Sequence, residues 1–241
     1  MKNALKNLAC SALLMGMLAL VSPAQAQVPQ LFATFSQIGQ LPSFSYVAGT
    51  SGATLGLASA IPVSFQFQAD NSFGAAIGQD IMASMTMSAV SAGNAFSSTS
   101  FLVQPMKDIE LRFTSASATP NSGDLLKMTL STGNLVARAG GQTARLTGTE
   151  STTSTDRVTF ESSYLDFAPQ LLAKNYSISF TSVAPAVANG GNGSLAPFTA
   201  TGTGNFGSDP LPKPQNSIPE PATLILAALG GLALARRKRH A

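Results

Sequence analysis

The stretch Ile61-Pro62-Val63-Ser64-Phe65-Gln66-Phe67-Gln68 alternates between apolar residues and residues of other kinds. Its apolar side chains of Ile, Val and Phe occupy every second position, at 61, 63, 65 and 67. Successive side chains of a β-strand point to opposite faces, so a period of two places these side chains on one face. The stretch therefore predicts a strand that is buried on one side and meets water on the other.

The same alternation recurs through the chain from residue 27 to residue 206. Its clearest further examples are residues 109–113, 158–160 and 176–180. Turn-forming residues such as Pro120-Asn121-Ser122-Gly123 separate these stretches, and no segment keeps a helical period for more than a turn or two. Roughly ten short strands of this kind predict an all-β fold, an antiparallel β-sandwich of the jelly-roll type. One face of each strand is expected to pack on the opposite sheet and the other to meet water.

Charge is distributed unevenly along the chain. The whole chain has a formal net charge of +3, but residues 27–218 contain eight Lys and Arg against ten Asp and Glu. The central body therefore has a net charge of about −2, and the basic excess belongs to the two ends. Because nucleic acids bind to basic surfaces, we expect no nucleic-acid partner for the body.

The body lacks the side chains on which most catalytic and metal sites depend. The single cysteine, Cys10, and the single histidine, His240, lie near the two ends, and the chain has no Trp. Without a thiolate or an imidazole, the body cannot form a Cys or His nucleophilic site, a zinc site of the usual kind or a disulfide. We therefore expect a non-enzymatic protein without catalytic residues, cofactor or metal ion.

Carboxylates remain as candidates for a binding or hydrolytic site. Asp108, Glu110 and Arg112 share one face of a predicted strand, where a solvated charge stripe is the favoured interpretation. Asp166 lies close to Tyr164 in the sequence, and an acid beside an aromatic ring suits a sugar pocket. With three Tyr and no Trp, however, the chain is poorly equipped with aromatic platforms for carbohydrate. A hydrolase with a carboxylate-only site is the least favoured hypothesis.

Residues 1–26 have the features of a secretory signal peptide. Lys2 and Lys6 precede an apolar run at residues 8–21, which is expected to form the signal helix. The small residues Ala24 and Ala26 then form an A-x-A cleavage site. We expect the Sec translocon to export the chain and signal peptidase to cut it after Ala26.

The C-terminal part of the chain predicts a linker followed by a membrane segment. Residues 207–218 form a Pro-rich linker that is expected to be extended. Residues 219–241 contain Pro219-Glu220-Pro221, then an apolar run at 222–235, then the cations Arg236, Arg237, Lys238 and Arg239. The run predicts a transmembrane-type helix about 21 Å long, which is short for a permanent span. The basic cluster acts as a membrane stop that stays in the cytoplasm, with the body outside.

These parts, in this order and at the end of the chain, resemble the PEP-CTERM sorting domain found in many Gram-negative bacteria. The resemblance rests on Pro219, Glu220 and Pro221, on the apolar segment and on the cluster from Arg236, about a tenth of the chain. It implies recognition and cleavage near Pro219–Pro221 by a membrane-embedded cysteine protease of the exosortase type. It also implies secretion that is linked to exopolysaccharide or a biofilm matrix.

Two signals, one at each end, agree on export. The expected route leads through an inner-membrane intermediate to the cell envelope or the extracellular matrix. The sequence thus predicts a signal peptide (1–26), a β-sandwich body (27–206), a linker (207–218) and a sorting and anchor segment (219–241). The predicted function is that of a non-enzymatic envelope or matrix protein. The alternative is a carbohydrate-binding module of the cell surface or matrix, with exopolysaccharide as a partner.

Overall fold

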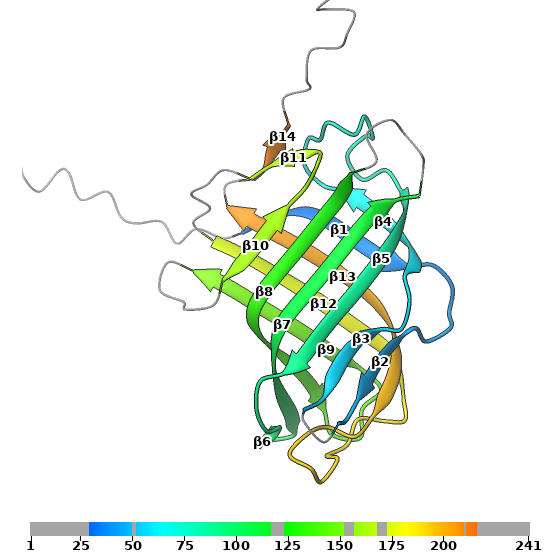
Figure 1. The fold of residues 1–241 in the computed structure, drawn as a ribbon, viewed down its shortest axis with the longest axis vertical. Coiled ribbons are helices and arrows are strands. Elements are labelled where there is room, and N and C mark those ends of the chain that lie inside the picture. The colour runs from blue at the N-terminus through cyan, green and yellow to red at the C-terminus, as the bar shows by residue number, and fades with distance from the viewer. Residues whose placement is uncertain are drawn as a thin grey trace, which may run out of the picture.

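The computed structural model describes residues 29–49, 52–116, 123–151, 157–167, 173–209 and 211–215. Within these ranges the chain forms fourteen β-strands and no helix (Figure 1). The strands are β1 (Gln30–Gln37), β2 (Phe44–Val47), β3 (Thr54–Leu57), β4 (Ile61–Phe67), β5 (Ile81–Ser91), β6 (Phe96–Ser98), β7 (Phe101–Ser115), β8 (Asp124–Arg138), β9 (Ala144–Ser151), β10 (Val158–Glu161), β11 (Leu165–Asp166), β12 (Ala173–Ala184), β13 (Phe198–Asp209) and β14 (Lys213–Pro214). The predicted all-β class is therefore confirmed, and the strand stretch with which the sequence analysis began is β4.

Most of the strands belong to a single antiparallel sheet that closes on itself. This sheet has twelve strands, and its hydrogen-bonded pairs lead from β1 through β4, β5, β7, β8, β9 and β12 to β13. Because β13 also pairs with β1, the circuit returns to its start. The short strands β2 and β3 form a second link across the circuit, because β2 pairs with β13 and with β3, and β3 pairs with β5.

The sandwich of two separate sheets that the sequence predicts is not confirmed. Figure 1 shows a layer formed by β5, β7 and β8 that crosses a layer formed by β9, β12 and β13, but β8 pairs with β9 and joins the layers. Alternation identifies the buried face of a strand and not its neighbours, so it cannot distinguish one closed sheet from two open ones. The predicted terminal helices lie outside the described residues, and within those ranges no helix is long and apolar enough to cross a membrane.

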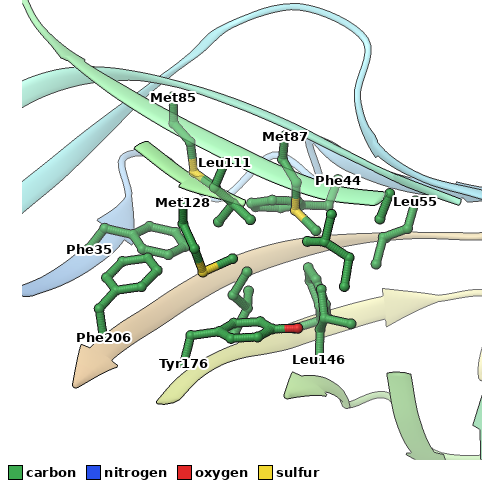
Figure 2. Close-up of a cluster of buried hydrophobic side chains, with 14 of the residues drawn as sticks. Phe35, Phe44, Leu55, Met85, Met87, Leu111, Met128, Leu146, Tyr176 and Phe206 are labelled. Atoms are coloured by element: carbon green, nitrogen blue, oxygen red, sulfur yellow. The ribbon is translucent and has the colours of Figure 1, made fainter. Parts of the chain in front are cut away.

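The core fills the space between the two layers. Figure 2 shows Met85, Met87, Leu111 and Met128 on one layer facing side chains of the other layer. The facing side chains that Figure 2 labels include Leu146, Tyr176 and Phe206, together with Phe35 of β1, which pairs with β13. All of these residues are buried, as the alternation within their strands requires. The period of two that is visible in the sequence is thus the physical basis of the core.

One buried polar network ties β2 to β7 at an end of the sheet. The side chain of Gln104 is fully buried, and its Oε1 accepts a hydrogen bond of 3.0 Å from the Tyr46 hydroxyl. Its Nε2 donates to the Gly93 carbonyl at 2.7 Å and to the Pro105 carbonyl at 3.2 Å. Burial raises the pKa of Tyr46, so the hydroxyl remains a proton donor at physiological pH.

We expect Gln104→Leu to lower the free energy of unfolding by about 1–2 kcal/mol, because it removes buried hydrogen-bond partners from Tyr46 and Gly93. Urea denaturation of the purified chain, followed by far-UV circular dichroism, measures this loss. The matched control is Gln30→Leu, at an exposed position of β1, for which we expect a change within about 0.5 kcal/mol. Equal stability of the two variants would contradict the role given to the network.

Candidate functional site

The residues to which the sequence assigns functions lie outside the described part of the chain. They are the cleavage-site residues Ala24 and Ala26, the sorting motif Pro219-Glu220-Pro221 and the basic residues 236–239. The described residues show two other structural features that bear on function. One is the path by which the folded body leads towards the sorting segment, and the other is a pair of grooves on its outer surface.

The C-terminal part of the chain stays attached to the folded body as far as Gln215. After β13 ends at Asp209, the short strand β14 (Lys213–Pro214) pairs with β11 (Leu165–Asp166). Gln215 then donates its backbone N–H to the Tyr164 carbonyl at 3.1 Å and its Nε2 to the Ser162 carbonyl at 2.9 Å. These contacts form a strap, residues 211–215, that lies against the body.

The strap changes the predicted boundary between body and linker. Residues 207–209, which the sequence analysis assigned to the linker, belong to β13, where Gly207 pairs with Leu31 and with Asn175. Lys213–Pro214 is also paired rather than free. A two-residue strand with a proline has no alternation to reveal it, and proline is tolerated at a sheet edge. The composition of this region therefore concealed its attachment.

The segment that receives the strap is itself anchored. The Ser162 hydroxyl donates to the Leu125 carbonyl at 2.7 Å and accepts from the backbone N–H of Tyr164 at 3.0 Å. Tyr164 is 4% exposed, and its ring packs edge-on against Phe73 with the centroids 4.9 Å apart. The strap thus rests on a well-packed part of the fold, and the predicted sorting segment begins four residues beyond Gln215, at Pro219.

The carboxylates that the sequence analysis considered do not converge on a catalytic centre. Tyr164 is buried whereas Asp166 is exposed, so the two do not form the sugar pocket that was considered. Asp108 and Glu110 are exposed on β7, and Arg112 pairs with Asp124 instead, with Nε and Oδ1 2.6 Å apart. Within the described ranges, no group of three or more His, Cys, Asp or Glu side chains could hold a metal ion.

Two adjoining grooves lie on the outer face of the closed sheet. The polar groove, of about 320 Å³, is lined by β9, β12 and β13 together with Pro29 and Leu31. The basic groove, of about 660 Å³, is lined by β7, β8, β9 and β12, including the hairpin residue Thr143. Arg145 and Thr147 of β9 line both, so the grooves meet there.

The charge in these grooves is of one sign. Arg145 lines both grooves, Arg138 lines the basic groove, and no Asp or Glu of the described ranges lines either of them. The Arg145 Nε donates to the Ser177 hydroxyl at 2.6 Å, which orients its guanidinium over β12. The described residues form three ion pairs, and neither Arg138 nor Arg145 belongs to any of them. Both guanidiniums are thus without a carboxylate partner among the described residues.

Strand register aligns uncharged polar side chains across the same face. One row of side chains runs across six strands, each residue standing opposite the next. In the order β8, β9, β12, β13, β1 and β4 the row consists of Asn134, Thr147, Ser177, Asn205, Thr34 and Gln66. Four hydroxyl residues form part of the next row, Ser179, Thr203, Ser36 and Ser64. Sequence reasoning missed this surface because the polar positions of separate strands do not reveal the register that assembles them.

Comparison with known proteins identifies the C-terminal signal. Residues 217–239 match the PEP-CTERM protein-sorting motif, which confirms the resemblance that the sequence suggested. No curated protein matches the chain, and no solved structure matches it. The chain is therefore an exported all-β protein that passes by way of the membrane to the cell envelope. More particularly, it carries the signal by which an exosortase, a membrane protease, sorts and processes its substrates.

Proposed function

We propose that this protein is a non-enzymatic structural or adhesive component of the cell envelope or of an exopolysaccharide-containing biofilm matrix. The observation that carries the proposal is the sorting motif at residues 217–239. In this proposal the Sec translocon exports the chain and signal peptidase cuts after Ala26. The C-terminal segment holds the chain in the inner membrane until the exosortase cuts near Pro219–Pro221, and the body is then released.

The described body suits a structural role outside the cell. The eight strands of the closed circuit each have a partner strand on both sides, and the strands with a free edge, such as β6 and β10, are short, which lowers the risk of edge-to-edge aggregation. The buried side chains of both layers supply stability without a disulfide, since the chain contains one Cys. The exposed and scattered carboxylates support a body without a hydrolytic centre.

The strap sets where the protease must act. Gln215 is bound to the body, and the four peptide steps from it to Pro219 span at most about 14 Å when fully extended. While the strap is in place, the cleavage site therefore lies close to the folded body. This arrangement favours cleavage at the membrane surface, with the body resting near the protease.

We expect replacement of Pro219, Glu220 and Pro221 by alanine to abolish C-terminal processing, so that the uncut chain accumulates in the membrane fraction. Mass spectrometry of the secreted and membrane-bound forms measures both ends of the chain. The matched control replaces the exposed residues Asp70, Pro42 and Pro62 by alanine, which removes one acid and two prolines outside both the motif and the strap. Normal processing and location of the motif variant would overturn the sorting role.

A second candidate function is carbohydrate binding by the body. The observation that favours it is the outer face on which hydroxyl and amide side chains form rows across β9, β12, β13 and β1. Such side chains offer both donors and acceptors, as sugar hydroxyls do. Binding of the purified chain to purified polysaccharides tests this function separately from sorting.

A further inference from the structure

We infer that the polar and basic grooves together bind an acidic polysaccharide, a glycan whose sugars carry carboxylates. The inference rests on the second candidate function, glycan binding, and names the place and the chemical class of ligand. It does not depend on the sorting signal. Three properties of the grooves support it: their charge, their hydrogen-bonding groups and their apolar ends.

Charge selects an anionic ligand. The body as a whole has more acids than bases, yet Arg138 and Arg145 line grooves to which the part of the chain that the structure describes contributes no acid. A guanidinium binds a carboxylate through two parallel N–H groups, and such charge-assisted hydrogen bonds are stronger than neutral ones. Since β8 and β9 pair antiparallel next to each other, both cations project from one part of the sheet. They can therefore contact neighbouring acidic sugars of one chain.

The remaining polar side chains suit sugar hydroxyls. Asn175, Ser177 and Asn205 line the polar groove, while Thr143, Ser179 and Thr181 line the basic groove. Each hydroxyl or amide group can both donate and accept, so each matches either role of a sugar hydroxyl. Except for Thr143 in the hairpin, these groups are held on paired strands, so they lose little freedom when a ligand binds. A neutral, hydrogen-bonding surface around two cations is thus what an acidic glycan requires.

An exposed apolar side chain marks each end of the combined grooves. Phe101, in the basic groove, is 48% exposed and stands directly opposite Arg138 on the neighbouring strand. Leu31, in the polar groove, is 46% exposed. All three tyrosines are at most 4% exposed, so Phe101 provides the aromatic contact for the C–H face of a sugar. From β7 to β1 the surface crosses five strand spacings, or roughly 24 Å around the sheet, which suits an extended chain.

Other polymers fit the grooves less well. Residues 144–147 of β9 and 173–180 of β12 pair with neighbours on both sides, so a peptide cannot add to them as a further strand. Nucleic acids need many cations along a phosphate backbone, whereas these grooves offer two in a body of net negative charge. An acidic glycan, with its hydroxyls between carboxylates, matches the composition better.

The test measures binding of the full chain, purified in mild detergent, to polygalacturonate by isothermal titration calorimetry. Fully methyl-esterified polygalacturonate has the same sugar ring and no charge, and polyglutamate has the charge and no sugar. We expect polygalacturonate to bind at least about tenfold more tightly than either, and more weakly at high salt. Replacing both arginines, Arg138→Gln with Arg145→Gln, is expected to weaken the binding of polygalacturonate by about tenfold or more.

The matched control is Lys107→Gln with Arg157→Gln, which removes two exposed cations outside both grooves and should leave binding unchanged. Circular dichroism melting of each variant confirms that it folds. Equal binding of the esterified polymer would overturn the acidic class and leave glycan binding in place. Equal binding of polyglutamate, or the same loss in the control variant, would overturn the site. Absence of binding to every polymer would overturn both the site and the second candidate function.

Discussion

Replacing Phe113 by alanine is expected to lower the free energy of unfolding by about 3–5 kcal/mol. Phe113 lies on β7 and is fully buried. Its ring centroid lies 5.0 Å from that of Phe35, 5.2 Å from that of Phe65 and 5.7 Å from that of Phe206. These three partners belong to β1, β4 and β13, none of which is a hydrogen-bonded neighbour of β7, so one side chain connects strands that the sheet itself does not pair. Its removal opens a cavity that a closed sheet cannot collapse to fill.

Urea denaturation followed by far-UV circular dichroism measures this effect, since the chain has no Trp to serve as a fluorescent probe. Phe113→Leu keeps most of the buried volume and is expected to lose about a third as much stability. The matched control is Phe96→Ala on β6, because Phe96 is 53% exposed and its truncation leaves no cavity. A loss from Phe113→Ala no greater than that from Phe96→Ala would contradict the central place of Phe113 in the core.

The sequence predicted individual strands well because the period of two is a local property. The stretch at 61–67 became β4 with Val63, Phe65 and Phe67 fully buried, as its alternation indicates. The closure of the sheet was not predictable in the same way. It depends on the pairing of β1 with β13, which joins residues more than 160 positions apart, such as Thr34 and Asn205. No local pattern in either strand records that register.

The same reasoning explains which functional features the sequence revealed. The sorting signal is a linear motif, so its residues could be identified in order, and the match at residues 217–239 confirms it. The grooves are assembled from positions on six different strands, and Arg138 or Arg145 alone indicates only a solvated cation. The strap escaped notice because proline-rich composition is typical of a free linker, whereas hydrogen bonds from Gln215 hold it to the body.

Glycine positions on β13 show how close packing depends on that distant register. Gly204 stands opposite Phe35 on β1, and a Cβ added to it would lie 2.4 Å from the Phe35 ring and 3.0 Å from the Ser177 carbonyl oxygen. The ring has little room to move, because it packs against Phe113 and, as Figure 2 shows for the labelled pair, beside Phe206. The backbone oxygen cannot move without disturbing β12. Glycine is therefore required at position 204 because a Cβ has no room there, and not because the backbone conformation excludes other residues.

Gly204→Ala is accordingly expected to lower the free energy of unfolding by about 2–3 kcal/mol through overpacking, measured by the same denaturation. In the open space at Gly93, where no atom lies within 4 Å of an added Cβ, the control Gly93→Ala should change stability by less than about 0.5 kcal/mol. Combining Gly204→Ala with Phe113→Ala gives the Phe35 ring space to move, so the double variant should lose at least about 1 kcal/mol less than the sum of the single losses. Strict additivity would mean that the Phe35 ring does not transmit the clash, and that contact with the Ser177 backbone alone makes alanine unfavourable at this position.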